Sequence, residues 1–355
     1  MLKKLSVTIL TAICYFSAFS QADSSKAPAS PTFSGSVDAY YRYNFANAKD
    51  ADGNPITNNY TSFTNSQNSF ELGMASIRAD HTFGKASATV DLGFGKRAEE
   101  FSYNDNGTVA AIKQLYVTYS PVADLKFTAG KWATHFDCEL PDAYLNRNYS
   151  MSYLFSYGPF FHTGLKAELT RGKLLFMLGV ANPADYTTTT ESHKHLLAQI
   201  AFTSANSKFK AYLNYHGGKS NDSLKMNAVN LTAFYTVSSK FSIVSNSSIK
   251  FSQGRTIDKW NSANKWWGTA LYLNVDPVSW FGLTWRNEYF NDEESVIGFG
   301  GNIYESTLSA NFRVDNLTII PEFRLDNAEN EIFVKNDGTS TKSTGSFILG
   351  VAYHF

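Results

Sequence analysis

The amino-acid sequence predicts an all-β fold, a transmembrane antiparallel up-and-down β-barrel of about sixteen strands with short periplasmic turns and long extracellular loops. Three observations lead to this prediction. Apolar and polar residues alternate along many segments, short and long connections take turns between those segments, and aromatic residues gather near the segment ends. We expect one barrel domain over residues 33–355, preceded by a secretory signal peptide at 1–22 and a flexible leader at 23–32.

The amino terminus has the pattern of an export signal. Lys3 and Lys4 give a positive start, an apolar run covers residues 5–19, and small residues allow cleavage after Ser20 or Ala22. An uncleaved membrane anchor is the less favoured alternative, because the apolar run is short for a spanning helix. Together with the barrel pattern, this signal predicts a multi-pass protein of the outer membrane of a Gram-negative bacterium.

Strict alternation is clearest over residues 33–45, where apolar side chains such as Val37 take one face and polar side chains such as Asp38 take the other. The segment 70–83 changes phase near residues 74–75, which a β-bulge would explain. Strands are predicted at 33–45, 70–83, 86–96, 110–120, 125–134, 161–170, 173–182, 196–204, 208–217, 226–237, 240–251, 266–276, 279–290, 303–313, 317–326 and 346–355. The residues expected to face lipid include Val90, Leu165, Leu213, Phe323 and Val351.

The connections between these strands alternate in length. The short ones lie at 84–85, 120–124, 171–172, 205–207, 238–239, 276–279 and 314–316. The long polar ones lie near 46–69, 97–109, 135–160, 183–195, 218–225, 252–265, 291–302 and 327–345. Outer-membrane barrels place short turns in the periplasm and long loops outside, whereas a soluble sandwich has no reason to alternate its loops so regularly.

Aromatic residues near the strand ends suggest the girdles that membrane barrels carry at both interfaces, although ordinary core aromatics are an alternative. They are Tyr119, Trp132, Tyr215, Trp267, Trp280, Phe281, Tyr289, Phe290 and Tyr353. The last nine residues alternate up to a terminal Phe355. This ending resembles the C-terminal strand that the outer-membrane assembly machinery recognises, so we expect that machinery, outer-membrane lipid and lipopolysaccharide as partners.

Charge and cysteine content exclude several classes. The chain has 31 basic and 31 acidic residues, which gives no support to nucleic-acid binding. Loss of Cys14 with the signal leaves Cys138 alone, so no internal disulfide is possible. No Gly-x-Ser-x-Gly, His-Glu-x-x-His or phosphate-binding loop is present, and we expect no catalytic residues, no cofactor and no metal.

A barrel of about sixteen strands encloses a water-filled lumen. The basic candidates for lining it are Arg42, Arg78, Lys166, Lys210, Arg286, Arg313 and Arg324. The acidic candidates are Asp38, Asp80, Asp91, Glu168, Glu288, Glu322 and Asp326. The mixture predicts a polar passage with no strong ion preference; alternatively, these side chains only brace the inner wall.

The third long loop, residues 135–160, is the most informative connection because it is both long and aromatic. General porins have a similar arrangement, with a third loop folded inward to narrow the pore. By that resemblance, the candidates for a constriction are His135, Asp137, Glu139, Asp142 and Arg147. A cap packed on the barrel rim is the alternative.

Two stretches, Leu140–Ser150 and Gly158–Gly164, carry a more specific resemblance. They resemble the OmpL-like family of outer-membrane β-barrel porins, and the similarity extends over about residues 33–355. The resemblance implies an outer-membrane porin, hence passive diffusion of small hydrophilic solutes and a possible homotrimer. Two other classes stay open. One is a barrel enzyme of protease or lipase type, for which His135, Cys138 and their acidic neighbours are the candidates, and the other is a structural or adhesin barrel acting through its outer loops.

Overall fold

The computed structural model describes residues 30–257 and 259–355. The signal predicted at 1–22 and most of the leader predicted at 23–32 lie outside these residues. Thr32, the last residue assigned to the leader, is already the first residue of a strand. None of the helices in the described residues is long and apolar enough to span a membrane.

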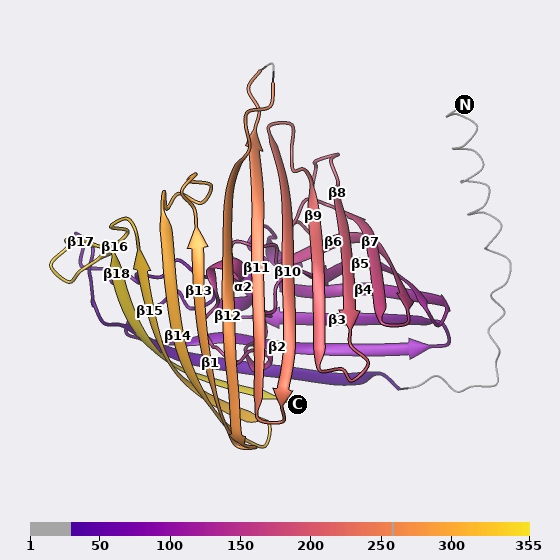
Figure 1. Ribbon diagram of the computed structural model, residues 1–355, viewed down its shortest axis with the longest axis horizontal. Helices are drawn as coiled ribbons and strands as arrows, with labels where there is room; N and C mark the ends of the chain where they lie inside the picture. The colour runs from indigo at the N-terminus through magenta and orange to yellow at the C-terminus, as the bar shows by residue number, and fades with distance from the viewer. Residues whose placement is uncertain (1–29, 258) are drawn as a thin grey trace. The chain divides into compact units, whose positions relative to one another are not determined.

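Sixteen antiparallel strands close into a barrel, as the sequence predicts (Figure 1). They are β1 (Thr32–Asn44), β2 (Ser69–Phe83), β3 (Ala86–Phe94), β4 (Ile112–Val122), β5 (Leu125–Ala133), β6 (Phe161–Arg171), β7 (Leu174–Ala181), β8 (His195–Thr203), β9 (Phe209–Lys219), β10 (Leu224–Ser238), β11 (Phe241–Gly254), β12 (Asn264–Val278), β13 (Phe281–Asn291), β14 (Asn302–Val314), β15 (Leu317–Ala328) and β18 (Ser343–His354).

The first and last strands close the ring. β1 pairs antiparallel with β18, from Ser36 opposite His354 to Asn44 opposite Ser346. Closure is required because lipid cannot satisfy the free peptide groups at the edge of an open sheet. This pairing completes the barrel that the sequence predicts.

The predicted break in β2 is a β-bulge. Val37 pairs with Ala75 and Ala39 pairs with Leu72, so that Asp38 alone faces two residues of β2. The Asp38 carboxylate accepts a hydrogen bond from the Met74 backbone N–H at 3.0 Å. The extra residue reverses the alternation of β2 and places Asp38 at a fixed point on the inner face.

Several strand boundaries differ from the prediction. β4 begins two residues late because residues Gly107–Ala111 form a 3-10 turn, η2, and it runs on to Val122. The strands β10, β11 and β12 are longer than predicted at their outer ends. Backbone pairing continues there beyond the expected lipid-facing region, where an alternating pattern is no longer needed and the sequence does not mark the strand.

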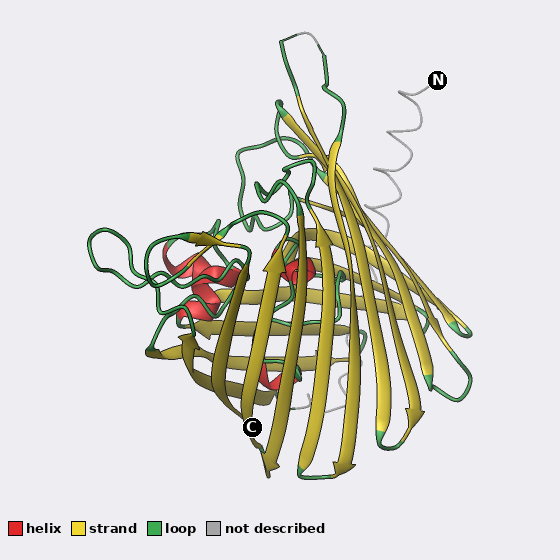
Figure 2. Cartoon of the chain, turned by 60° about the vertical axis from the view of Figure 1, so that its left-hand side comes forward, coloured by secondary structure: helices red, strands yellow, loops and turns green. Residues whose placement is uncertain are grey.

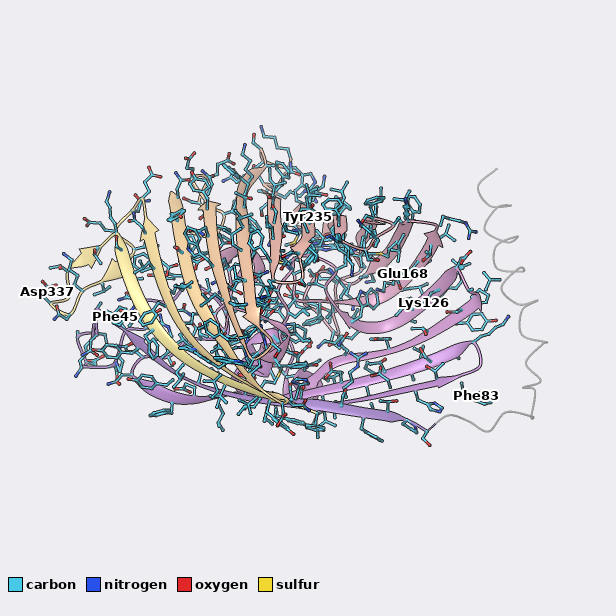
Figure 3. All side chains as sticks on the ribbon, turned by 60° about the horizontal axis from the view of Figure 1, so that its bottom comes forward. Phe45, Phe83, Lys126, Glu168, Tyr235 and Asp337 are labelled. Atoms are coloured by element: carbon cyan, nitrogen blue, oxygen red, sulfur yellow. The ribbon has the colours of Figure 1, made fainter. Side chains whose placement is uncertain are left out.

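The two faces of the barrel differ as the alternation requires. Leu165, Leu213 and Phe323 expose between 47% and 57% of their surface on the outside. Aromatic side chains at strand ends, such as Phe45, Phe83 and Tyr235, are also exposed (Figure 3).

Two aromatic residues predicted for the outer girdles lie inside the barrel instead. Phe290 is fully buried against Tyr153 and Trp266, and Trp132 is buried beside His162. Position near a strand end suggested a girdle, but their parity along the strand places both side chains on the inner face.

Four short helical segments and a small hairpin interrupt the long loops. They are α2 (Lys96–Phe101), η2, η3 (Ala143–Leu145), α3 (Tyr153–Ser156) and the hairpin of β16 (Phe333–Val334) and β17 (Ser340–Thr341). η3 contacts β1 and β18, and α3 contacts β12 and β13, on the inside of the ring of strands (Figure 2).

A lysine in place of Leu213 should impair assembly. Leu213 lies near the middle of β9 on the outer face, where a lysine costs about 2–4 kcal/mol. Lys210→Glu on the same strand is the matched control, because this side chain lies on the opposite face. It is close to the end of the barrel that carries the short turns, which we call the inner mouth. We expect Leu213→Lys to lower the folded fraction in the outer membrane, measured by heat-modifiable gel mobility, and Lys210→Glu to leave it unchanged. Equal tolerance would mean that the faces are misassigned.

Candidate functional site

The long loop between β5 and β6 enters the barrel, where its backbone is hydrogen-bonded to Glu322 and Glu288; we call residues 135–160 the inner loop. At its base, the Thr134 backbone N–H donates to the Phe160 carbonyl at 2.9 Å. Between these ends, the inner loop contacts side chains from strands all around the ring, from β1 to β15.

Two buried carboxylates of the barrel hold the backbone of the inner loop. Glu322 accepts hydrogen bonds of 2.7 and 3.0 Å from the N–H groups of residues 149–150. Glu288 accepts two bonds of 2.7 Å from the N–H groups of residues 153–154. Charge-assisted bonds to backbone N–H groups are among the stronger hydrogen bonds of proteins. The loop conformation is therefore fixed by its backbone as well as by its side chains.

Arg286 joins the inner loop to the same sector. This fully buried guanidinium donates to Glu139 at 2.7 Å and to the Ser150 carbonyl at 2.8 Å, and it pairs with Glu305 at 3.0 Å. A buried charge is tolerated only when it is paired and hydrogen-bonded. Glu305 of β14 pairs with Arg286 without the inner loop, and the inner loop adds the second carboxylate and the carbonyl acceptor.

Arg324 on β15 makes a second cationic contact. Its Nη1 donates to the Met151 carbonyl at 2.7 Å, and its guanidinium lies 5.2 Å from the centre of the Tyr153 ring. The Tyr153 hydroxyl donates to Asp326 at 2.9 Å, and Asp326 also pairs with Arg324. The three side chains form a closed network between loop and barrel.

The opposite sector binds the inner loop through Asp142 and Tyr149. Asp142 pairs with Lys113 of β4 at 2.6 Å, and Lys113 also lies 3.2 Å from Asp91. The Tyr149 hydroxyl donates to Asp38, the residue at the β-bulge. Sequence reasoning missed Lys113, because a second break in register between β3 and β4 disturbs the alternation around it.

Arg97 of α2 lies in the same sector and was also missed. Its side chain is fully buried, 3.6 Å from the Asp38 carboxylate, and its guanidinium lies 4.8 Å from the centre of the Tyr149 ring. The residue belongs to an outer loop in sequence, where alternation carries no information, and only the folded helix α2 brings it inside.

Arg147 anchors the inner loop near the inner mouth. Its guanidinium forms two bonds of 3.0 Å with Asp276, which also lies 3.0 Å from Arg313. Such a two-pronged contact fixes orientation as well as distance.

The start of the inner loop is hydrogen-bonded to a ladder of three asparagines. Asn214 donates to Asn230 at 2.8 Å, Asn230 donates to Asn246 at 2.7 Å, and Asn246 donates to Asp137 at 2.6 Å. The three amides are buried on the adjacent strands β9, β10 and β11. Sequence reasoning missed them because it followed charged residues only, although their spacing along the chain is regular.

The charged candidates from the sequence all lie on the inner face, but in two different environments. Those covered by the inner loop or by other outer loops are Asp38, Arg42, Asp91, Arg286, Glu288, Glu322, Arg324 and Asp326. Those nearer the inner mouth are Arg78, Asp80, Lys166, Glu168, Lys210 and Arg313. In the second group Arg78 pairs with Asp80 at 2.7 Å, and Glu168 pairs with Lys126 at 2.8 Å (Figure 3).

Burial also changes the titration of the inner loop. It raises the pKa of Asp137 to about 6, an effect to which the nearby Glu139 adds. It lowers the pKa of His135 to about 4, because burial penalises the charged imidazolium. Both shifts favour the neutral forms where the inner loop meets β9 to β11.

Cavities remain on both sides of the inner loop. An outer cavity of about 740 Å³ is lined by residues of the long loops together with His216 and Lys250. An inner cavity of about 350 Å³ is lined by β2 to β6, including Trp132 and Lys166. A further cavity of about 210 Å³ lies beside Asp142. The inner loop therefore divides the lumen rather than filling it.

Comparison with known proteins identifies the family and supports the barrel fold. The model of the family described as "Putative beta-barrel porin-2, OmpL-like" matches residues 30–355. A search of curated proteins finds no significant sequence match. Similar solved structures are the anion-selective porin of Comamonas acidovorans (TM-score 0.60, 12% identity, 92% of this chain and 99% of that chain) and the outer membrane channel DcaP of Acinetobacter baumannii (0.59, 12%, 93% and 99%).

A third similar structure is OmpT of Vibrio cholerae, with a TM-score of 0.59 and 11% identity over 93% of this chain and 99% of that chain. At such identities these likenesses establish the fold alone. The family match covers nearly all of the chain and the whole barrel. The protein therefore belongs to the OmpL-like family of β-barrel porins.

Proposed function

We propose that the protein is an outer-membrane porin through which small hydrophilic solutes diffuse passively. The observation that carries this proposal is the division of a polar lumen into an outer cavity of about 740 Å³ and an inner cavity of about 350 Å³ by one inserted loop. Sixteen strands enclose enough space for an aqueous channel, and a loop inside that space sets its narrowest section.

The inner loop is proposed to set the pore size. Its contacts with β13, β14 and β15 are dense and buried, so solutes must pass on the remaining side of the lumen. The ion preference depends on the charges left facing that side. The paired charges under the loop contribute little to it, because their partners compensate them.

Catalysis is not proposed. The enzyme hypothesis rested on Cys138 and its acidic neighbours, but Glu139 is bound to Arg286 and Asp137 to Asn246. Burial raises the pKa of the Cys138 thiol, which disfavours the nucleophilic thiolate. A structural or adhesin role through the outer loops remains the second candidate, favoured by the hairpin β16–β17 among those loops.

We also propose a location in the outer membrane and assembly through the last strand. The Phe355 backbone pairs with Gly35 at 3.0 Å, and its ring is 58% exposed beside β1. Lipid and lipopolysaccharide would contact the apolar outer face. OmpT of Vibrio cholerae has a trimer form, and we propose a homotrimer for this protein as well.

Shortening the inner loop should increase conductance. The test variant replaces residues 143–156 with a short glycine-serine linker, which removes the contacts with Glu288, Glu322 and Arg324. Single-channel recording in planar bilayers should show conductance raised by at least about twofold, because the narrowest section widens. Unchanged conductance would mean that the loop does not limit the passage. No current from either protein would favour the adhesin or enzyme alternative.

Weakening the hydrogen bonds that Glu288 and Glu322 form with the inner loop should make the channel current fluctuate more. In Glu288→Gln/Glu322→Gln, each acceptor of two backbone N–H groups loses one oxygen, at a cost of about 1–3 kcal/mol per unpaired group. We expect more frequent transitions between current levels and a higher mean conductance. Lys210→Gln, outside the loop contacts, is the control. Traces identical to wild type would show that these carboxylates do not hold the loop.

The proposed homotrimer is tested by measuring the molar mass of the purified protein. Light scattering on detergent-purified protein, corrected for bound detergent, should give about three times the mass of one barrel. A monomer under conditions that preserve the folded barrel would contradict this part of the proposal.

A further inference from the structure

Four of the seven histidines gather inside the barrel; we call His135, His162, His195 and His216 the histidine row. His162 lies on β6, His195 on β8 and His216 on β9, and His135 opens the inner loop. Ring centres are separated by 5.2 Å between His135 and His162, and by 5.9 Å from His216 to both His162 and His195. The imidazoles are therefore direct neighbours.

The row contains several buried ring nitrogens without a hydrogen-bond partner among the described residues. Nδ1 is unpaired in all four rings, and His216 lacks a partner at Nε2 as well. The side chains of His162, His195 and His216 are at most 1% exposed. Buried polar atoms are paired in the great majority of cases, so this concentration requires an explanation.

The position of the histidine row offers an explanation for these unpaired nitrogens. Trp132 lines the inner cavity, and its ring centre is 6.5 Å from that of His162. His216 lines the outer cavity, next to Lys250. Phe136 of the inner loop lies 4.8 Å from the His216 ring. A continuous line of rings thus separates the two cavities, on the side of the lumen that the dense loop contacts leave free.

The charged groups around the row determine what protonation does there. They are Lys166 and Glu168 of β6, Lys250 of β11, Lys131 of β5 paired with Asp105, Asp137 of the inner loop and Asp185 of the loop after β7. Lys250 lies near Asp185. An additional imidazolium would be repelled by Lys250 and Lys166, and the acidic groups around the row would offset part of that repulsion.

The packed arrangement of the histidine row, in which the rings are buried, favours neutral imidazoles. Burial lowers the pKa of His135 to about 4, so this ring resists protonation near neutral pH while it is packed. A row in contact with water regains the ordinary imidazole pKa of about 6.5. Acid therefore favours the hydrated arrangement over the packed one, and the charged rings that result repel one another.

We propose that solutes pass between the two cavities through the histidine row, and that its protonation opens the passage and makes it favour anions. The proposal rests on the porin function proposed above. It places the residues that control the passage of solutes on the β6–β9 side of the lumen, and not among the acidic and basic pairs under the inner loop.

The test compares wild type with His162→Gln/His216→Gln in planar bilayers at about pH 7.5 and about pH 5, on either side of the ordinary imidazole pKa. Wild type should conduct at least about twofold more at the lower pH, and its reversal potential in a KCl gradient should shift towards chloride. The double variant should lose both responses, because glutamine keeps a polar side chain that does not titrate. His81→Gln on β2, outside the row, should behave as wild type.

His135→Gln is a second variant that leaves every strand unchanged, so a smaller pH response is expected even if the double variant assembles poorly. A wild-type protein that conducts equally at both pH values would overturn the inference, as would a full pH response in the histidine variants. In both cases the channel still conducts and the porin proposal stands. Absence of current in every form would remove both proposals.

Discussion

Peptide groups have no hydrogen-bond partner in lipid, and the rest of this structure depends on that constraint. The chain meets it by closing β1 onto β18, so that every strand of the barrel has two neighbours. A ring of sixteen strands is too wide for its own side chains to fill. The charged inner face then needs partners, and the inner loop supplies them: its backbone N–H groups bind Glu288 and Glu322, and its Glu139 binds Arg286.

The inner loop is held more tightly on one side of the lumen than on the other. Towards β13, β14 and β15 it is joined by fully buried carboxylate and guanidinium contacts, whose disruption would leave uncompensated charge. Towards β6, β8 and β9 its neighbours are imidazoles with ring nitrogens that have no partner among the described residues. Ion pairs such as Glu139–Arg286 hold the loop on the first side, and the described residues include no ion pair between the loop and β6, β8 or β9. This asymmetry supports a passage along the histidine row.

Sequence alone predicted the strands well, because each membrane-spanning strand faces lipid on one side and the lumen on the other. Apolar and polar residues must therefore alternate with a period of two. Even the β-bulge at Asp38 left a visible break in the alternation of β2. Parity also placed Lys166 and Arg324 on the inner face, but alternation predicts only the face on which a side chain lies and not the residues that it contacts. The approach of Arg97 to Asp38, and of Lys113 to Asp142, depends on loop geometry and on a second break in register, neither of which the alternation encodes. The burial of Trp132 and Phe290 was missed for a different reason: parity places both side chains on the inner face, but their position near strand ends suggested a girdle.

The account requires the inner loop to lie against β14 inside the barrel, and cross-linking of two cysteines tests this placement. The Asn148 side chain of the loop donates to Ser309 of β14 at 2.6 Å, so thiols at these two positions lie within the span of a short bifunctional reagent. In a Cys138→Ser background, Asn148→Cys/Ser309→Cys should be cross-linked by a short bis-methanethiosulfonate in the folded protein in its membrane, seen as a loss of maleimide labelling that a reductant reverses. Folded protein that is not cross-linked, and in which both cysteines are labelled by an impermeant maleimide added from outside, would show that the loop lies elsewhere.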